Sequence, residues 1–337
     1  MQFRSRSRFE VRIRSALLVL ILAAFGWRLQ ALTVQSLWRD EVDAIYFALR
    51  NLPDTLAMFL QAGQNGPLYF LALRPWFYLA GASEFALRFP SAVFGTLSIP
   101  LLYQVARLLL AGWLTVNIPA DGDSSDHTTR PSIHTLVPLV PLLAAGLLAV
   151  NPYQLWYSQE GKMYTLVTAL SLTATWCWLV GITRGGWRPW LSYLLTVSIA
   201  IYSHLLMILL IPLHLVWFVI AWPQSKAHWR GYGLALAGLT LPYLPMVWWQ
   251  WDLLLAADKR TGFSFTPLLP MVRTLILNHS RGFLPDDNLL LLAPLFFLAL
   301  AGLVLGMTEL PAKAADSSRC DLQFGAVRRW LLLTSWL

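Results

Sequence analysis

Long apolar runs separated by short polar connections dominate the pattern of this sequence. Residues 16–32 form the first run, and five arginines precede it within the first fifteen residues. A helix needs about 20 mainly apolar residues to cross the hydrocarbon core of a bilayer, and basic residues favour its cytoplasmic side. The first run therefore predicts a retained spanning helix, with Arg28 snorkelling near its outer end. Further runs predict helices at about 84–110, 136–150, 162–183, 187–203, 205–222, 231–250 and 287–308.

The segment Leu68–Ala80 is apolar but too short to span. It has 13 residues and contains Arg74 and Pro75, which favours a helix lying against the outer interface of the membrane. This assignment places the first acidic loop and the segments 151–164 and 202–204 together on the outer side. It also places these basic connections inside, as the positive-inside rule requires: Arg107 and Arg130, Arg184 and Arg188, Lys226 and Arg230, and Lys313, Arg319, Arg328 and Arg329.

Composition supports a membrane protein and excludes an ordinary soluble domain. Hydrophobic residues make up 57% of the 337 residues and charged residues only 12%, with a mean hydropathy of +0.56. In soluble domains about a quarter of the residues are charged. The net charge of +8 does not indicate a nucleic-acid partner, because the basic residues lie in short loops beside apolar runs. The two cysteines form no metal-binding spacing.

We predict an all-α fold, a polytopic bundle of transmembrane helices that forms one membrane-embedded domain over residues 1–337. Within it, residues 33–83 form an outer loop, residues 111–135 an inner loop and residues 252–286 a second outer loop. The last residues begin a new apolar run that is too short to span. We therefore expect the natural protein to continue beyond residue 337.

Asp40 and Glu41 are the candidate catalytic residues. They are adjacent acids in an outer loop, just beyond the first predicted span. One carboxylate there can accept the proton of an attacking hydroxyl, while its neighbour orients the acceptor or binds a cation. The alternative is a structural acid pair, because the helix macrodipole favours acids in the first turn of a helix. The sequence leaves both interpretations open, and it leaves the need for a divalent cation open as well.

A second polar cluster lies in the connection of residues 151–164. Donors and acceptors are dense there, and they include Tyr157, Gln159, Glu160 and Lys162. Lys162 can neutralise charge that builds on a leaving phosphate. The alternative is a lysine that snorkels at a helix end.

Arg88 and His204 complete the outer candidates. Arg88 lies near the outer start of a span, where it can hold a phosphate or pair with Glu84 four residues earlier. His204 can bind a phosphate or a hydroxyl, although a lone histidine also fits a structural role. The second outer loop adds basic residues that suit an anionic lipid head: Lys259, Arg260, Arg273, His279 and Arg281.

Five segments follow one another in the order SLWRDE, QNGPLYFLALRPWF, SEFALRFPSAVFGTL, NPYQLWYSQEGKMY and IYSHLLMILL. In this order they resemble the membrane-embedded GT-C glycosyltransferases, specifically the family 39-like group with protein mannosyltransferases and aminoarabinose transferases. The resemblance covers about residues 10–250. It implies a helical bundle with juxtamembrane helices in the first outer loop and a sugar donor on polyprenyl or dolichyl phosphate. It also implies Asp40 as the catalytic carboxylate, Glu41 as its partner, and Lys162 near the donor phosphate, where relatives often have arginine.

We therefore expect a multi-pass glycosyltransferase whose site lies at the outer face of a bacterial plasma membrane. It would transfer a sugar from a polyprenyl-phosphate donor to a hydroxyl of a lipid, glycan or protein, with inversion. Its donor site would contain Arg88, Tyr157, Gln159, Glu160, Lys162 and His204. The alternative is a transporter or flippase that binds a lipid head with the same cluster. Few charges within the apolar runs and no clear half-repeat favour the enzyme.

Overall fold

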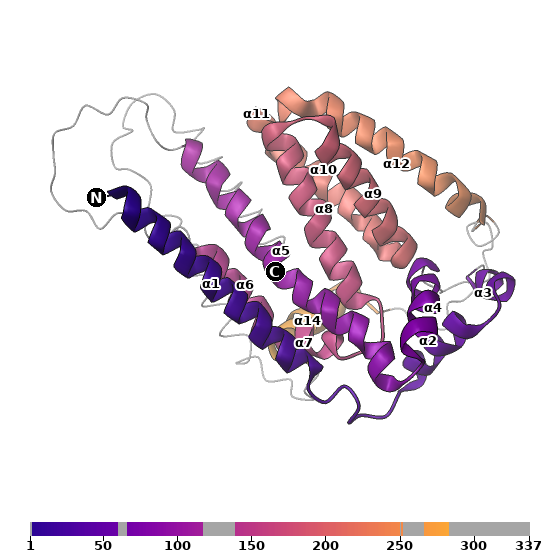
Figure 1. Ribbon diagram of the computed structural model, residues 1–337. Coiled ribbons are helices and arrows are strands. Elements are labelled where there is room, and N and C mark those ends of the chain that lie inside the picture. Colours follow the sequence, from indigo (N-terminus) through magenta and orange to yellow (C-terminus); the bar gives the residue numbers. More distant parts are fainter. Residues whose placement is uncertain (1, 60–65, 117–138, 250, 252–265, 283–337) are drawn as a thin grey trace, which may run out of the picture.

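The computed structural model describes residues 2–59, 66–116, 139–249, 251 and 266–282, and every regular element in these ranges is a helix (Figure 1). The all-α prediction is thereby confirmed. The longer helices are α1 (Gln2–Leu29), α4 (Leu68–Ala80), α5 (Glu84–Val116), α6 (Leu139–Val150), α8 (Tyr164–Arg184), α9 (Trp187–Ser203), α12 (Trp229–Trp249) and α14 (Leu268–Arg281). The shorter ones are α2 (Arg39–Leu49), α3 (Leu52–Met58), α7 (Pro152–Ser158), α10 (Leu210–Ile220), α11 (Trp222–Ser225) and the 3₁₀ helices η2 (Leu205–Leu209) and η3 (Lys226–His228). The predicted run 287–308 and the basic residues Lys259 and Arg260 lie outside the described residues.

Two of these helices are long and apolar enough to cross a membrane, namely Glu84–Leu109 of α5 and the whole of α8. The pair α6 and α7, bent by 58° at its break, adds a third if it forms one span. The apolar stretch Leu205–Ile220 and helix α9 are shorter, and α12 contains Pro242 and Pro245. The described residues thus contain two or three helices suited to span a membrane, and the full polytopic bundle stays a prediction.

The long helices pack side by side, and the connections that follow α1, α7 and α9 lie toward the same end of the bundle (Figure 1). Helix α5 packs against α1, α6 and α8, while α9 lies between α8 and α12. The short helices α2, α3 and α7, together with α4 and α14, gather where α1 ends and α8 begins. We call this region the polar end. Helix α4, which contacts α2 and α9, has the bounds that the sequence predicted for a short helix that does not span.

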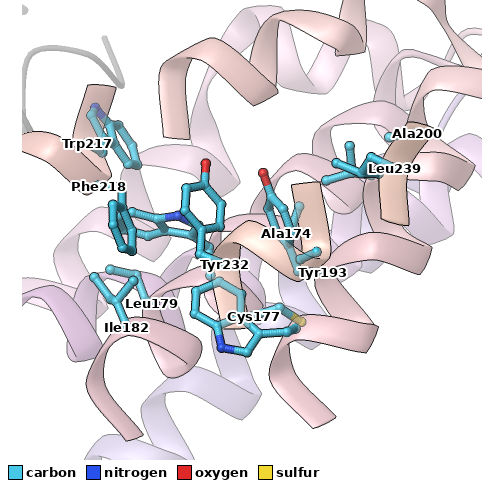
Figure 2. Packing of buried hydrophobic residues seen from close by; sticks show 14 of the residues in the cluster. Ala174, Cys177, Leu179, Ile182, Tyr193, Ala200, Trp217, Phe218, Tyr232 and Leu239 are labelled. Atoms are coloured by element: carbon cyan, nitrogen blue, oxygen red, sulfur yellow. The ribbon is translucent and has the colours of Figure 1, made fainter. Parts of the chain in front are cut away.

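The largest core lies between α8, α9, α10 and α12, and Figure 2 shows part of it. Phe218 and Tyr232 stack there with ring centroids 4.6 Å apart. Trp190 of α9 packs against two glycines of neighbouring helices. A Cβ atom would lie 2.8 Å from the indole ring at Gly181 of α8 and 2.3 Å from its Nε1 at Gly231 of α12. Small residues at these two positions therefore let one tryptophan join three helices.

A hydrogen-bonded triad crosses the same core. His214 is fully buried, and its ring nitrogens Nε2 and Nδ1 each lie 3.1 Å from a hydroxyl, of Thr175 and of Tyr193 respectively. The Thr175 hydroxyl already donates to the carbonyl oxygen of Ser171, so it accepts from an Nε2–H group of His214. The other ring nitrogen, Nδ1, shares a hydrogen bond with the Tyr193 hydroxyl. Both nitrogens of the buried ring therefore have partners, and the bonds link α8, α9 and α10.

Gly181→Ala should destabilise the protein, because the added methyl group meets the rigid ring of Trp190 rather than open space. Overpacking of this kind costs about 1–3 kcal/mol. The matched control is Gly233→Ala in α12, where an added Cβ meets nothing within 4 Å. Thermal unfolding in detergent checks both variants. A Gly181→Ala protein as stable as the control would contradict the close packing of α8 on α9.

Candidate functional site at the polar end of the bundle

Asp40 and Glu41 both lie in the first turn of α2, but their side chains have opposite environments. Glu41 falls on the buried face of the helix with Ala44 and Phe47, and its side chain is 1% exposed. The Asp40 side chain is 44% exposed. Adjacent helical residues point about 100° apart, so one acid enters the interior while the other stays at the rim. Both acids lie in the first turn of the helix, where the macrodipole favours negative charge. Asp40, the exposed one, remains accessible to a ligand.

Glu41 forms a buried, two-pronged ion pair with Arg88 of α5. The Arg88 Nε atom lies 2.8 Å from Glu41 Oε1, and its Nη2 atom lies 2.6 Å from Oε2. The other N–H groups of Arg88 donate to the carbonyl oxygens of Leu32, Gln35 and Ser36 at 2.7, 2.8 and 3.3 Å. The guanidinium therefore uses all its donors, and it ties the segment before α2 to α5. Of the two predicted roles, ion pairing holds, but with Glu41 instead of Glu84.

The connection between α7 and α8 runs along the face of α5 that carries Arg88. The Gly161 amide donates to Glu41 Oε1 at 2.7 Å, and the Ser91 hydroxyl donates to the Lys162 carbonyl at 3.0 Å. A Cβ atom at position 161 would lie 2.3 Å from Leu87 Cγ, so only glycine brings the backbone this close. We call residues 159–163 the acid–base loop. Glu41, Arg88 and Gly161 together form what we call the carboxylate junction.

Lys162 projects from the acid–base loop toward Asp40. Its Nζ atom lies 4.0 Å from Asp40 Oδ2, and its side chain is 10% exposed. The ammonium also lies 5.8 Å from the ring centre of Phe70 in α4. Burial lowers the pKa of Lys162, while the carboxylates of Asp40 and Glu160 oppose this shift. Lys162 is therefore a poorly solvated cation whose nearest carboxylate, Asp40, is accessible.

Glu160 is a buried carboxyl group in the same loop. It is 6% exposed, and its Oε1 atom accepts no hydrogen bond from any described residue. Burial raises the pKa of Glu160 from 4.5 to about 7, and the Glu41 carboxylate adds to the rise while Lys162 opposes it. Near neutral pH the group therefore exchanges a proton easily, and protonation would give it a donor for a ligand oxygen.

Arg28 is buried instead of snorkelling, contrary to the sequence prediction. It is fully buried, and it donates to the Ser158 hydroxyl at 3.1 Å and to the carbonyls of Ala24 and Ala149 at 3.2 Å. Ala149 lies beside the break between α6 and α7, where a helix leaves carbonyls without partners. A Cβ atom at Gly95 of α5 would lie 2.1 Å from the Ser158 hydroxyl. Arg28 thus ties the bent pair α6 and α7 to α1, a role that local sequence patterns could not reveal.

The remaining predicted residues also lie at the polar end. Gln159 donates to the Gln30 carbonyl at 2.8 Å and fixes the acid–base loop to the end of α1. The ring of Tyr157 lies 4.5 Å from that of Tyr164, which in turn lies 6.3 Å from the ring of His204. The structure therefore brings together the eight residues predicted for the catalytic and donor-binding sites. No group of three acidic, histidine or cysteine side chains suited to a metal occurs among the described residues.

Comparisons with protein-family models, curated proteins and solved structures give no match. The resemblance to GT-C glycosyltransferases therefore stays a prediction.

Arg88→Met should cost about 3–5 kcal/mol of stability, because it leaves the Glu41 carboxylate buried without its cation. The double variant Glu41→Gln, Arg88→Met should lose less than the sum of the two single variants. The control is Arg14→Met, because Arg14 pairs with Glu10 across 3.9 Å with both side chains more than 70% exposed, and such pairs contribute little. Unfolding in mixed detergent micelles measures the stability of the wild type and of all four variants. Strict additivity would contradict a coupled buried pair.

Glu160→Gln should stabilise the protein at alkaline pH. The folded-state pKa of Glu160 is raised to about 7, so the folded protein favours the protonated form of this carboxyl group. Below the ordinary pKa the free energy of unfolding is not reduced by this group, and it falls as the pH rises through 7 and the buried group ionises. Glutamine removes that loss, which amounts to at most about 3 kcal/mol at pH 8 and vanishes near pH 4. Unfolding measured from pH 4 to 8 tests this, with the exposed Glu10→Gln as the control. Parallel curves for wild type and Glu160→Gln would contradict a buried carboxyl at this position.

Proposed function

We propose that this protein is a membrane glycosyltransferase that uses a polyprenyl-phosphate sugar as its donor. The observation that carries the proposal is the pairing of an accessible carboxylate with a desolvated cation, Asp40 Oδ2 and Lys162 Nζ, 4.0 Å apart. A sugar transfer with a phosphate leaving group needs a base for the attacking hydroxyl and a cation for the departing oxygens. Both groups lie at the end of the bundle where the spanning helices α5 and α8 begin.

The proposed reaction is a single displacement. The acceptor hydroxyl oxygen attacks the anomeric carbon, the bond from that carbon to the phosphate oxygen breaks, and the hydroxyl proton passes to Asp40. The phosphate leaves with its electron pair toward Lys162 and, below about pH 7, toward protonated Glu160. Attack opposite the leaving group inverts the anomeric carbon. The acceptor thus gains the sugar and loses its hydroxyl proton to Asp40. The donor loses the sugar and leaves as free prenyl phosphate, which keeps the oxygen of the broken bond.

Glu41 and Arg88 receive positioning roles in this proposal. The Glu41 carboxylate accepts from both Arg88 and Gly161, and the N–H groups of Arg88 are all engaged. The expectation that Arg88 neutralises the leaving phosphate stays a prediction. Lys162 is the stronger candidate, because within the described part of the chain its Nζ atom has a single charged partner, at 4.0 Å. The finer features, which are a polytopic GT-C-type bundle and a site at the outer membrane face, belong to the same proposal.

Asp40→Asn should reduce transfer by about 10²- to 10⁴-fold, because the amide cannot accept the proton of the hydroxyl. The assay follows release of free prenyl phosphate from a prenyl-phosphate sugar in membranes that contain the full chain. Asp54→Asn, which changes an exposed carboxylate in the neighbouring helix α3, is the control and should retain activity. Asp40→Asn at nearly the wild-type rate would remove Asp40 as the base. Movement of the lipid across the bilayer without phosphate release would instead favour the transporter or flippase.

A further inference from the structure

Five aromatic rings form a continuous row at the polar end. In order they are His279 of α14, Tyr153 and Tyr157 of α7, Tyr164 of α8 and His204 after α9. We call this row the aromatic ladder. Successive ring centroids are 6.0, 4.7, 4.5 and 6.3 Å apart. The rings therefore join segments that are far apart in the sequence.

The ladder frames the acid–base loop. Tyr157 precedes the loop by two residues, Tyr164 follows it directly, and their rings meet across its base. Glu160 and Lys162 lie within the loop that these two rings close. Any molecule that reaches Lys162 from the direction of α7 would therefore meet the ladder.

All five rings are partly exposed, and none belongs to the three buried hydrophobic clusters of the described residues. A row of rings that served only as packing would be buried with those clusters. A membrane-interface belt is the other structural explanation, because tyrosines anchor at that depth. Such anchors are spread around the perimeter of a bundle, whereas these rings touch one another beside two ionisable side chains.

The chemistry of the ladder favours a sugar over an isoprenoid chain. Each ring carries a polar atom, either a phenol oxygen or an imidazole nitrogen, so each offers an apolar face with a hydrogen-bonding edge. A pyranose ring has the matching pattern of C–H faces and hydroxyl edges. An isoprenoid chain carries no hydrogen-bonding group along its length, so it would match the apolar faces of these rings but not their polar edges.

We propose that the aromatic ladder binds the sugar ring of the donor, with Tyr157 and Tyr164 packed against its apolar face. This inference rests on the proposed function, because it assumes that the molecule at Lys162 is a prenyl-phosphate sugar. It assigns the two parts of the donor to different residues, so that Lys162 binds the phosphate and the aromatic ladder binds the sugar. The two contributions can be measured separately.

The test compares three probes by calorimetric binding to the full chain in detergent: farnesyl phosphate, and the same lipid with either a glucose or a mannose on its phosphate. Wild type should bind one of the sugar-bearing probes about 3- to 10-fold more tightly than farnesyl phosphate, as expected for one or two aromatic contacts. Tyr157→Leu and Tyr164→Leu should each reduce this preference toward 1 while still binding farnesyl phosphate. Lys162→Met should weaken the binding of all three probes by the same factor. Tyr78→Leu, at a side chain that is 91% exposed on α4, is the matched control and should keep the preference.

Each other outcome has a distinct meaning. If wild type prefers the sugar and both leucine variants keep that preference, the ladder is an interface belt, and only this inference fails. If the variants lose affinity for farnesyl phosphate but not for geranyl phosphate, the ladder binds the chain, and the inference fails again. If wild type binds none of the probes, the proposed function itself fails. Retained farnesyl phosphate binding shows that a variant is folded, and the second leucine variant decides the question if the first does not fold.

Discussion

The carboxylate junction is the constraint on which the rest of the polar end depends. A buried carboxylate and a buried guanidinium are stable inside a protein only when each satisfies the other completely. Glu41 and Arg88 meet this condition with a two-pronged contact, and their remaining bonds go to backbone groups. The backbone partners belong to two separate connections, the one before α2 and the acid–base loop. Formation of this one ion pair therefore fixes both connections against α5. As a result, Asp40 lies beside Lys162.

Arg28 performs a related task deeper in the bundle, by a different physical route. No carboxylate of the described residues pairs with it, and the partners of its guanidinium are two carbonyls and the Ser158 hydroxyl. Carbonyl dipoles near a helix break carry partial negative charge, so they can replace a counter-ion in part. The break between α6 and α7 is therefore stabilised where the chain turns by 58°. The segment that follows this turn packs closely on α5, because Gly95 of α5 leaves room for Ser158 and Gly161 of the acid–base loop leaves room for Leu87 of α5.

The sequence predicted the elements well and their partners poorly. Apolar runs located most helices, and the proline and arginine within Leu68–Ala80 correctly marked a short one. Alternation of apolar runs also predicted that the candidate residues share one end, because each crossing returns the chain to the same side. The pairing of Glu41 with Arg88 was not predictable, since it joins residues 47 apart in the chain. Nor was the burial of Arg28, because only the carbonyls of other helices explain why a charge can enter the bundle.

These environments determine how charge is distributed at the proposed site. The Glu41–Arg88 pair is internally balanced, which leaves Asp40, Glu160 and Lys162 to respond to a ligand. With Glu160 protonated, as its pKa of about 7 allows, Asp40 and Lys162 also balance each other. An arriving phosphate would compete with Asp40 for the ammonium, since their present separation of 4.0 Å is long for a charge-assisted hydrogen bond. On the proposed function, donor binding would thus release Asp40 to accept a proton, and the base would become available only when there is a sugar to transfer.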